Sequence, residues 1–253
     1  MRVEFLGTAG YHPSETRHTT GIFVPDAAPD HAFLLDGGSG TFRLNGRALP
    51  PNLHIFLSHA HLDHTCGLTF LYDTAHLYRQ NQNQDLKITL YGDAKTRGAV
   101  GEHLFAPLLF PLELKWDWQE IEAAQPFEVA GVKINTALLT HPGGSLGYRF
   151  DWPQTALGFI TDTARDPSYL DLIRGVELLI HERNFSDRYA EIAQASGHCT
   201  SRDLVEVARV SGAKGVAAMH FNPLTPTDPL EEDYVYGQIE NVVAAKDGMI
   251  LEF

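Results

Sequence analysis

The sequence contains few cysteines and no long apolar run. Only Cys66 and Cys199 occur among the 253 residues, and neither belongs to a CxxC pair. Two isolated cysteines cannot form a disulfide framework, so a reducing compartment is the simpler inference. Residues 1–7 are too few and too charged for a signal peptide, and no apolar stretch approaches membrane-spanning length. These absences predict a soluble cytoplasmic protein with no membrane partner.

Basic side chains are also scarce. The chain has 19 Lys and Arg against 32 Asp and Glu, which gives a formal net charge of −13 at pH 7. Nucleic-acid binding draws much of its strength from basic side chains that meet phosphates, and here those side chains are scattered without a dense run. The overall charge therefore favours a small-molecule substrate over a nucleic-acid partner, although a local basic patch stays open.

What is present favours a layered fold. With 43% hydrophobic residues, the chain can bury a substantial core, and no break in composition divides it, so residues 1–253 are predicted to form a single domain. Apolar runs alternate with helix-like periods, which predicts an α/β or α+β fold with a large sheet. The later strands are expected at 112–118, 132–139, 156–160, 176–180, 214–219 and 249–253, and helices at 201–211 and 230–245.

The densest polar motif is SHAHLDH at 58–64, directly after an apolar run. Imidazoles and a carboxylate crowded at the end of a buried strand need cations or many hydrogen-bond donors. His59 and His61 can project to the same side of the backbone and hold one metal. Asp63 and His64 follow where the chain turns and can serve a neighbouring metal. The motif therefore predicts half of a two-metal site, and a surface histidine cluster is the alternative.

This motif resembles the HxHxDH signature of the metallo-β-lactamase superfamily of metal-dependent hydrolases. The order of that family is matched by three later residues, each after an expected strand. The resemblance implies two sets of three metal ligands and one bridging aspartate: His59, His61 and His141; Asp63, His64 and His220; and Asp162. It also implies a four-layer αβ/βα sandwich with the metals at one edge. Asp36 is expected to orient a metal-binding histidine, with an ordinary turn aspartate as the alternative.

Two later motifs resemble the closing motifs of the tRNase Z and related phosphodiesterase branch. They are HE at 181–182, after the expected strand 176–180, and GH at 197–198. The resemblance implies that His181 protonates the leaving oxygen, with an acid nearby, and that His198 lies close to the site. A strand-end histidine with a structural role is the alternative for His181. The candidate catalytic residues are Asp63, His181 and His198.

The sequence departs from the tRNA-processing relatives in two places. Those enzymes carry a long arm between the third histidine and the bridging aspartate, whereas the interval from His141 to Asp162 is 21 positions, enough for a hairpin. Ser39 and Phe42 replace the acid and glutamine that usually follow Asp36. We therefore expect a dinuclear hydrolase, a phosphodiesterase that uses a metal-bridging hydroxide on a small or cyclic phosphodiester. The alternatives are a tRNA 3′-processing endoribonuclease and a lactone or thioester hydrolase.

The metal and the oligomeric state are less constrained by the sequence. Imidazole and carboxylate ligands suit zinc, manganese or iron, and we expect two divalent metal ions with zinc as the first choice. A homodimer is common among the relatives that the resemblance indicates. The apolar segment 104–114 suggests a surface for it, and core packing is the alternative.

Overall fold

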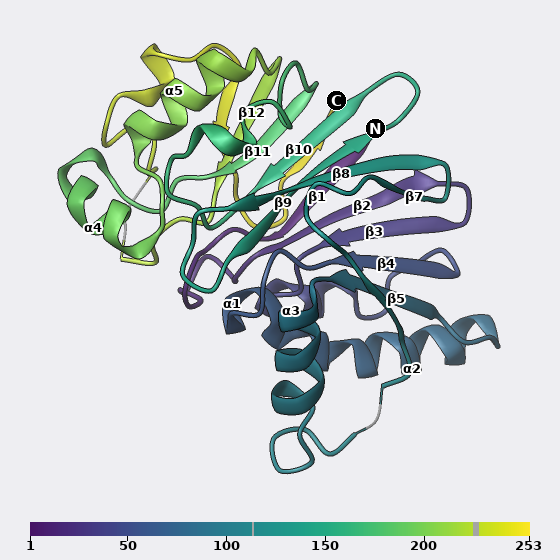
Figure 1. Ribbon diagram of the computed structural model, residues 1–253. Helices are drawn as coiled ribbons and strands as arrows, with labels where there is room; N and C mark the ends of the chain where they lie inside the picture. The colour runs from purple at the N-terminus through teal and green to yellow at the C-terminus, as the bar shows by residue number, and fades with distance from the viewer. Residues whose placement is uncertain (113, 225–227) are drawn as a thin grey trace.

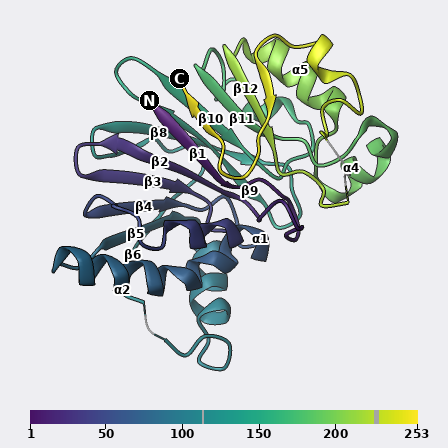
Figure 2. The same ribbon diagram turned by 180° about the vertical axis from the view of Figure 1, so that it is seen from behind.

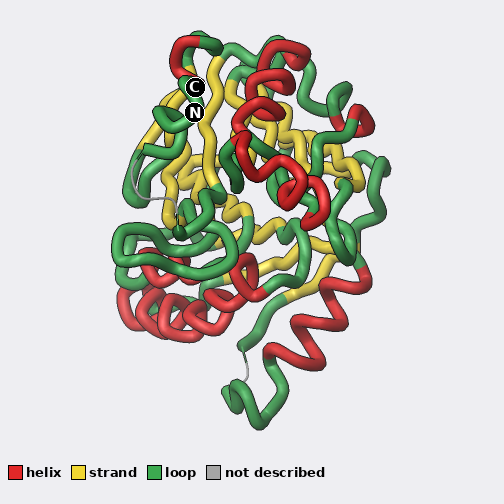
Figure 3. The backbone as a smooth tube through the Cα atoms, turned by 90° about the vertical axis from the view of Figure 1, so that its left-hand side faces the viewer, coloured by secondary structure: helices red, strands yellow, loops and turns green. Residues whose placement is uncertain are grey.

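The computed structural model describes residues 1–112, 114–224 and 228–253. Two seven-stranded sheets pack face to face, and helices cover their outer faces (Figures 1 and 2). Figure 3 shows the same arrangement from the side, with strands in the middle and helices around them. The predicted αβ/βα sandwich is confirmed by this layering.

The first sheet has antiparallel strands at one edge and parallel strands at the other. In spatial order it contains β14 (Ile250–Glu252), β1 (Arg2–Gly7), β2 (Gly21–Ala28), β3 (His31–Leu35), β4 (Asn52–Phe56), β5 (Lys87–Gly92) and β6 (Asp117–Glu120). Strands β3 to β6 are parallel. Parallel strands covered on both faces are apolar throughout, and β3 and β4 are buried over nearly their whole length.

The second sheet has a similar division. In spatial order it contains β13 (Val242–Ala244), β12 (Gly215–Met219), β11 (Leu178–Glu182), β10 (Ala156–Ile160), β9 (Ser145–Asp151), β8 (Val132–Leu139) and β7 (Phe127–Val129). Strands β10 to β13 are parallel, whereas β7 to β10 form antiparallel pairs. The β9–β10 hairpin accounts for most of the chain between His141 and Asp162.

The helices lie outside the two sheets. They are α1 (Leu62–Thr65), α2 (Leu71–Gln82), α3 (Ala94–Gly98), α4 (Ala190–Ser196) and α5 (Ser201–Ser211). Short 3₁₀ or π helices lie at Ser39–Leu44, Cys66–Phe70, Ala99–Leu104, Pro167–Tyr169, Asp187–Tyr189 and Val235–Gly237. Helix α5 begins and ends as its sequence predicts, because Thr200 and Asp203 form a capping box and Gly212 follows in the left-handed region.

Aromatic side chains fill the space between the sheets. Phe56 lies 5.0 Å from Phe33 and 5.1 Å from Phe150, measured between ring centroids. The Tyr148 hydroxyl donates a hydrogen bond of 2.7 Å to the carbonyl of Leu57, one residue before the SHAHLDH motif. The core therefore ties the second sheet to the chain segment that carries the motif.

One predicted helix is wrong and one predicted strand is displaced. Residues 230–245 contain a single 3₁₀ turn and the strand β13, because the β-branched pair Val242–Val243 pairs with β12 instead of continuing a helix. Asn241, just before that strand, has a positive φ of 56° that no helix tolerates. Of the strand expected at 112–118, only Asp117 and Trp118 lie in a strand, β6, while 112 and 114–116 are loop and residue 113 lies outside the described residues.

Two observations bear on the expected absence of a membrane partner and on the expected homodimer. Among the described residues, no helix combines the length and apolar character needed to cross a bilayer. In the segment 104–112, Phe105 packs against the outer cluster of the first sheet, whereas Leu108 is fully exposed. The cytoplasmic location and the homodimer stay predictions.

Candidate metal centre

Residues from both sheets meet at one edge of the sandwich. The strands β3, β4, β8, β10 and β12 each end there, followed by Asp36, His59, His141, Asp162 and His220. Three of these residues have left-handed backbone conformations, with φ of 57° at Asp36, 51° at Asp162 and 56° at His220. Such strained positions in residues other than glycine are concentrated at functional sites.

The first group of donor atoms contains three histidines and one aspartate. Ligand atoms of His59, His61, His141 and Asp162 lie within 4.8 Å of one another. Asp162 Oδ2 is 3.6 Å from His59 Nε2 and 3.6 Å from His141 Nε2, and His141 Nε2 is 3.3 Å from His61 Nδ1. Two of the nitrogens therefore lie at the same carboxylate oxygen, and His61 Nδ1 joins the group beside His141 Nε2.

The second group faces the other oxygen of the same carboxylate. Asp162 Oδ1 lies 3.0 Å from His220 Nε2 and 3.3 Å from His64 Nε2. Asp63 Oδ2 is 3.3 Å from each of these two nitrogens. Asp162 thus presents one oxygen to each group, which is the arrangement a bridging ligand needs.

The charges in this cluster suit divalent cations. Burial raises the pKa of Asp162, but the surrounding histidines outweigh burial and hold that pKa well below the ordinary value. Burial lowers the pKa of His59 well below normal, so His59 is a neutral imidazole, the form that binds metals. Burial also lowers the pKa of His64, yet Asp162, Asp63 and Asp36 together raise it well above normal. The carboxylates therefore create a strongly negative site that favours a positive charge.

One buried atom supports the same conclusion. His59 Nε2 is buried and has no hydrogen-bond partner among the described residues, although it points toward the cluster. An unsatisfied buried nitrogen costs about 1–3 kcal/mol, which a metal ion would recover. The donor set and this orphaned nitrogen fit a pair of divalent metals.

The neighbours of the candidate ligands hold their rings in place. Asp36, fully buried, accepts hydrogen bonds from His64 Nδ1 at 2.7 Å and from the backbone and hydroxyl of Ser58. The contact is the one expected for Asp36, because a metal-binding imidazole needs an acceptor for its other N–H. His141 Nδ1 donates to the Gly197 carbonyl at 2.9 Å, and the Asn184 amide lies 3.1 Å from His220 Nδ1.

The glycine-rich loop after β1 lies against the second group. The backbone N–H of Tyr11 donates a 2.7 Å hydrogen bond to Asp63 Oδ2. A Cβ atom at Gly10 would lie 2.5 Å from His220 Cε1, so any side chain there would displace the ligand. Gly10 could not be identified as a site residue from the sequence, because a glycine in a loop indicates a turn before it indicates a close approach.

His198 and Glu182 form a pair beside the cluster. The Glu182 carboxylate accepts backbone N–H bonds from Thr163 at 2.6 Å and Cys199 at 3.1 Å, and lies 3.2 Å from His198 Nδ1. Burial lowers the pKa of His198, but Glu182 and Asp162 together outweigh burial and raise it to about 9. With Nδ1 engaged by Glu182, Nε2 is the nitrogen that can face a substrate. Donor atoms of Glu182, His198 and His220 lie within 4.8 Å of one another.

The expected role of His181 as proton donor is wrong in this structure. His181 is fully buried, with Nε2 3.1 Å from the Tyr169 hydroxyl and Nδ1 bonded to the Glu182 carbonyl. Because β11 continues to Glu182, neighbouring residues point to opposite faces, and Glu182 faces the cluster while His181 faces away. In the sequence, Glu182 was part of the HE motif but received no role, because the strand was expected to end at Ile180. Alternation along the strand was the signal that could have identified it.

Comparisons with known proteins agree with the fold. Residues 21–221 match a family model described as "Beta-lactamase superfamily domain". A curated protein of Haloarcula marismortui named Ribonuclease Z is 26% identical over 310 aligned positions, which cover 98% of this chain and 96% of that protein. Two solved structures are similar to this chain. YhfI of Bacillus subtilis, a metallo-beta-lactamase fold protein, has a TM-score of 0.80 and 20% identity, with 99% and 98% of the two chains covered. The short form of human tRNase Z has a TM-score of 0.76 and 22% identity, with 100% and 99% covered.

The match to the family model spans most of the chain and includes all seven candidate metal ligands. The solved structures add agreement in fold over nearly the full length. The chain therefore belongs to the beta-lactamase superfamily and has the metallo-β-lactamase fold of its metal-dependent hydrolases.

Proposed function

We propose that this chain is a dinuclear phosphodiesterase that hydrolyses a small or cyclic phosphodiester. One observation carries the proposal: two groups of donor atoms share the carboxylate of Asp162, and the His198–Glu182 pair lies beside them. A phosphodiester needs cations near its nonbridging oxygens and a proton at its leaving oxygen. Both requirements can be met within this cluster.

The metal ligands are proposed in two sets. His59, His61 and His141 would hold one divalent ion, Asp63, His64 and His220 the other, and Asp162 both. When bound, two divalent ions supply Lewis acidity toward phosphoryl oxygens and lower the pKa of water. Zinc is our first choice, with manganese and iron as alternatives for the same donors.

The proton donor is proposed to be His198. Glu182 fixes its ring through Nδ1 and stabilises the imidazolium, so that a proton is held on Nε2 toward the substrate. Asp63 is proposed as a catalytic group as well as a ligand, because its carboxylate faces the same space and is oriented by the Tyr11 N–H. Together these residues bind, orient and protonate a diester.

The short chain segment between His141 and Asp162 favours a small substrate. The interval is occupied mainly by the β9–β10 hairpin, whose strands pair from Ala156–Asp151 to Phe159–Tyr148. The alignment with the Haloarcula protein runs over 310 positions, more than the 253 residues of this chain. Some segments of that protein are therefore aligned with gaps in this chain. A net charge of −13 also opposes association with a polyanion.

A panel of substrates tests the type of bond that is broken. We expect metal-loaded protein to hydrolyse bis(p-nitrophenyl) phosphate far faster than chromogenic thioesters or lactones of similar size. A His59→Ala variant with reduced metal content serves as the control for contaminating hydrolases. Selective turnover of the thioester or lactone would replace the proposal with carbonyl hydrolysis.

The second candidate is a tRNA 3′-processing endoribonuclease. It is favoured by curated relatives that carry the name Ribonuclease Z over nearly the full length of this chain. An RNA substrate would require a basic surface or a partner subunit to offset the acidic charge. Binding of a 3′-extended precursor tRNA, measured as salt is varied, tests this candidate, because phosphate contacts give a steep loss of affinity with salt.

A further inference from the structure

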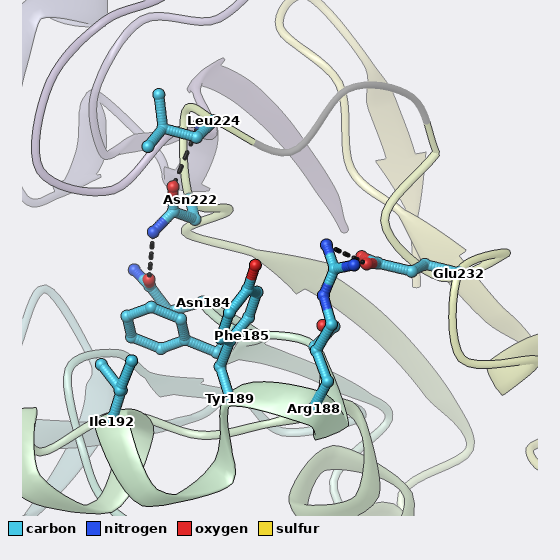
Figure 4. Close-up of a pocket in the computed structure, with 9 residues that line it drawn as sticks. Asn184, Phe185, Arg188, Tyr189, Ile192, Asn222, Leu224 and Glu232 are labelled. Carbon is cyan, nitrogen blue, oxygen red and sulfur yellow. Dashed lines mark hydrogen bonds and ion pairs between the residues drawn. The ribbon is translucent and has the colours of Figure 1, made fainter.

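A cavity of about 290 Å³ opens beside the metal centre (Figure 4). It lies among the loop after β11, helix α4 and the chain after β12. The apolar side chains that line it are Phe185, Tyr189, Ile192 and Leu224. Asn184 also lines the cavity, and its amide Nδ2 is 3.1 Å from Nδ1 of the candidate ligand His220. Asn184 therefore connects the wall of the cavity to a candidate metal ligand.

The cavity lies on the side of the proposed proton donor. The His198 ring is stacked 5.5 Å from the His220 ring and lies 6.0 Å from the Phe185 ring, measured between centroids. Phe185 in turn lies 6.4 Å from Tyr189. A proton donor faces the oxygen that leaves phosphorus. The group attached to that oxygen would therefore extend past His198 into this cavity.

The lining suits a flat group with a polar edge. Phe185 and Tyr189 present aromatic surface, and Figure 4 shows their rings beside each other with Asn184 and Asn222 above them. The two amides face each other at 3.4 Å. Ser186 also lines the cavity, is almost fully buried, and its Oγ has no hydrogen-bond partner within the described part of the chain. Aromatic faces beside amide and hydroxyl groups match a nucleobase, which has apolar faces and a hydrogen-bonding edge.

The size of the cavity limits what it can hold. Small-molecule pockets occupy about 300–1,000 Å³, so a volume of about 290 Å³ suits one base rather than a strand. At its margin, Arg188 and Glu232 form an ion pair of 3.0 Å that neutralises both charges. Among the described residues that line the cavity, no cation is therefore left uncompensated to hold a second phosphate.

We infer that this cavity is the subsite for the leaving group, and that the leaving group is a nucleoside whose base lies against Phe185 and Tyr189. The inference rests on the proposed phosphodiesterase function. In the reaction, water forms a new P–O bond and the bond from phosphorus to the nucleoside oxygen breaks. That oxygen takes the proton of His198, and the proton lost by water restores His198. From an acyclic diester, the case to which this inference applies, the products are a nucleoside and a phosphomonoester.

Two matched substrates isolate the contribution of the base. The methyl phosphodiester of adenosine 5′-phosphate and that of methyl riboside 5-phosphate have the same leaving oxygen, and only the first has a base. We expect release of adenosine and methyl phosphate, with kcat/KM about tenfold higher than for the base-free substrate. Tyr189→Ala should abolish most of this preference and leave the base-free substrate within twofold of wild type. Tyr72→Ala, which alters an exposed tyrosine on α2, is the matched control.

A binding measurement gives a second readout. By calorimetry, adenosine should bind wild type about tenfold more tightly than Tyr189→Ala, whereas methyl riboside should not distinguish them. Release of adenosine monophosphate and methanol, or an unchanged base preference in Tyr189→Ala, would overturn the inference while leaving the phosphodiesterase intact. Failure to hydrolyse either diester or bis(p-nitrophenyl) phosphate would instead overturn the proposed function.

Discussion

The histidines at positions 181 and 198 allow one experiment to separate catalysis from packing. Each is replaced by asparagine in otherwise identical protein. His198 is held by Glu182, and its side chain is 15% exposed, whereas the side chain of His181 is fully buried and contacts Tyr169. Removing His198 leaves Glu182 with its two backbone N–H donors. Removing His181 leaves the Tyr169 hydroxyl without its buried partner.

These contacts predict opposite effects of the two substitutions. General acid catalysis contributes about 10²–10⁴-fold, so His198→Asn should lower kcat by that factor for diesters with alkyl leaving groups. The same variant should slow bis(p-nitrophenyl) phosphate far less, because p-nitrophenolate leaves without a proton. His181→Asn should keep the wild-type dependence on the leaving group. It should lose about 1–3 kcal/mol in the free energy of unfolding through the unsatisfied hydroxyl.

The assay is kcat across a series of leaving groups, with metal content and urea denaturation measured for each variant. Metal content should stay near wild type in both variants. The assignment of His198 is refuted by equal slowing across the series in His198→Asn. It is also refuted if His181→Asn is the variant that slows poor leaving groups most.

Three further predictions concern metals and stability. His61→Ala should lower both bound metal, measured by elemental analysis, and turnover; unchanged stoichiometry would contradict its assignment as a ligand. Asp162→Ala should lose both metals together, and clean loss of one ion would count against a bridging role. Burial and the neighbouring His31 lower the pKa of His54 to about 4, below the value of about 6.5 in an unfolded chain. The folded protein therefore binds fewer protons, so stability present above pH 6.5 should fall as the pH drops toward 4. The melting temperature of His54→Gln should depend less on pH over this window, and an identical slope would exclude His54 as a cause.

Much of the site could be predicted because its residues follow strand ends. Asp36, His141 and Asp162 come within two residues of an apolar run, and parallel strands bring such positions to one edge. The SHAHLDH motif added the chemistry, since histidines at that spacing have few uses besides metal binding. The fold followed from the same apolar runs and from a resemblance in the ligands.

The sequence could not supply the directions in which side chains point or the distances between them. The role of His181 was taken from a family resemblance, whereas the structure shows that β11 runs on to Glu182, so that His181 and Glu182 point to opposite faces of the strand. The prediction of a helix at 230–245 was wrong for a different reason. Its residues have a helix-compatible composition, but pairing of Val242 and Val243 with β12 determined the structure. Gly10 acquired significance only when the His220 ring was found against it.

The most direct test of the account compares two substrates on the same metal-loaded protein. One is bis(p-nitrophenyl) phosphate and the other is a precursor tRNA with a 3′ extension, each assayed for kcat/KM at one salt concentration. We predict efficient hydrolysis of the diester and no accurate cleavage of the precursor. Accurate cleavage at the tRNA 3′ end, with the diester turned over poorly, would contradict the proposal of a small substrate.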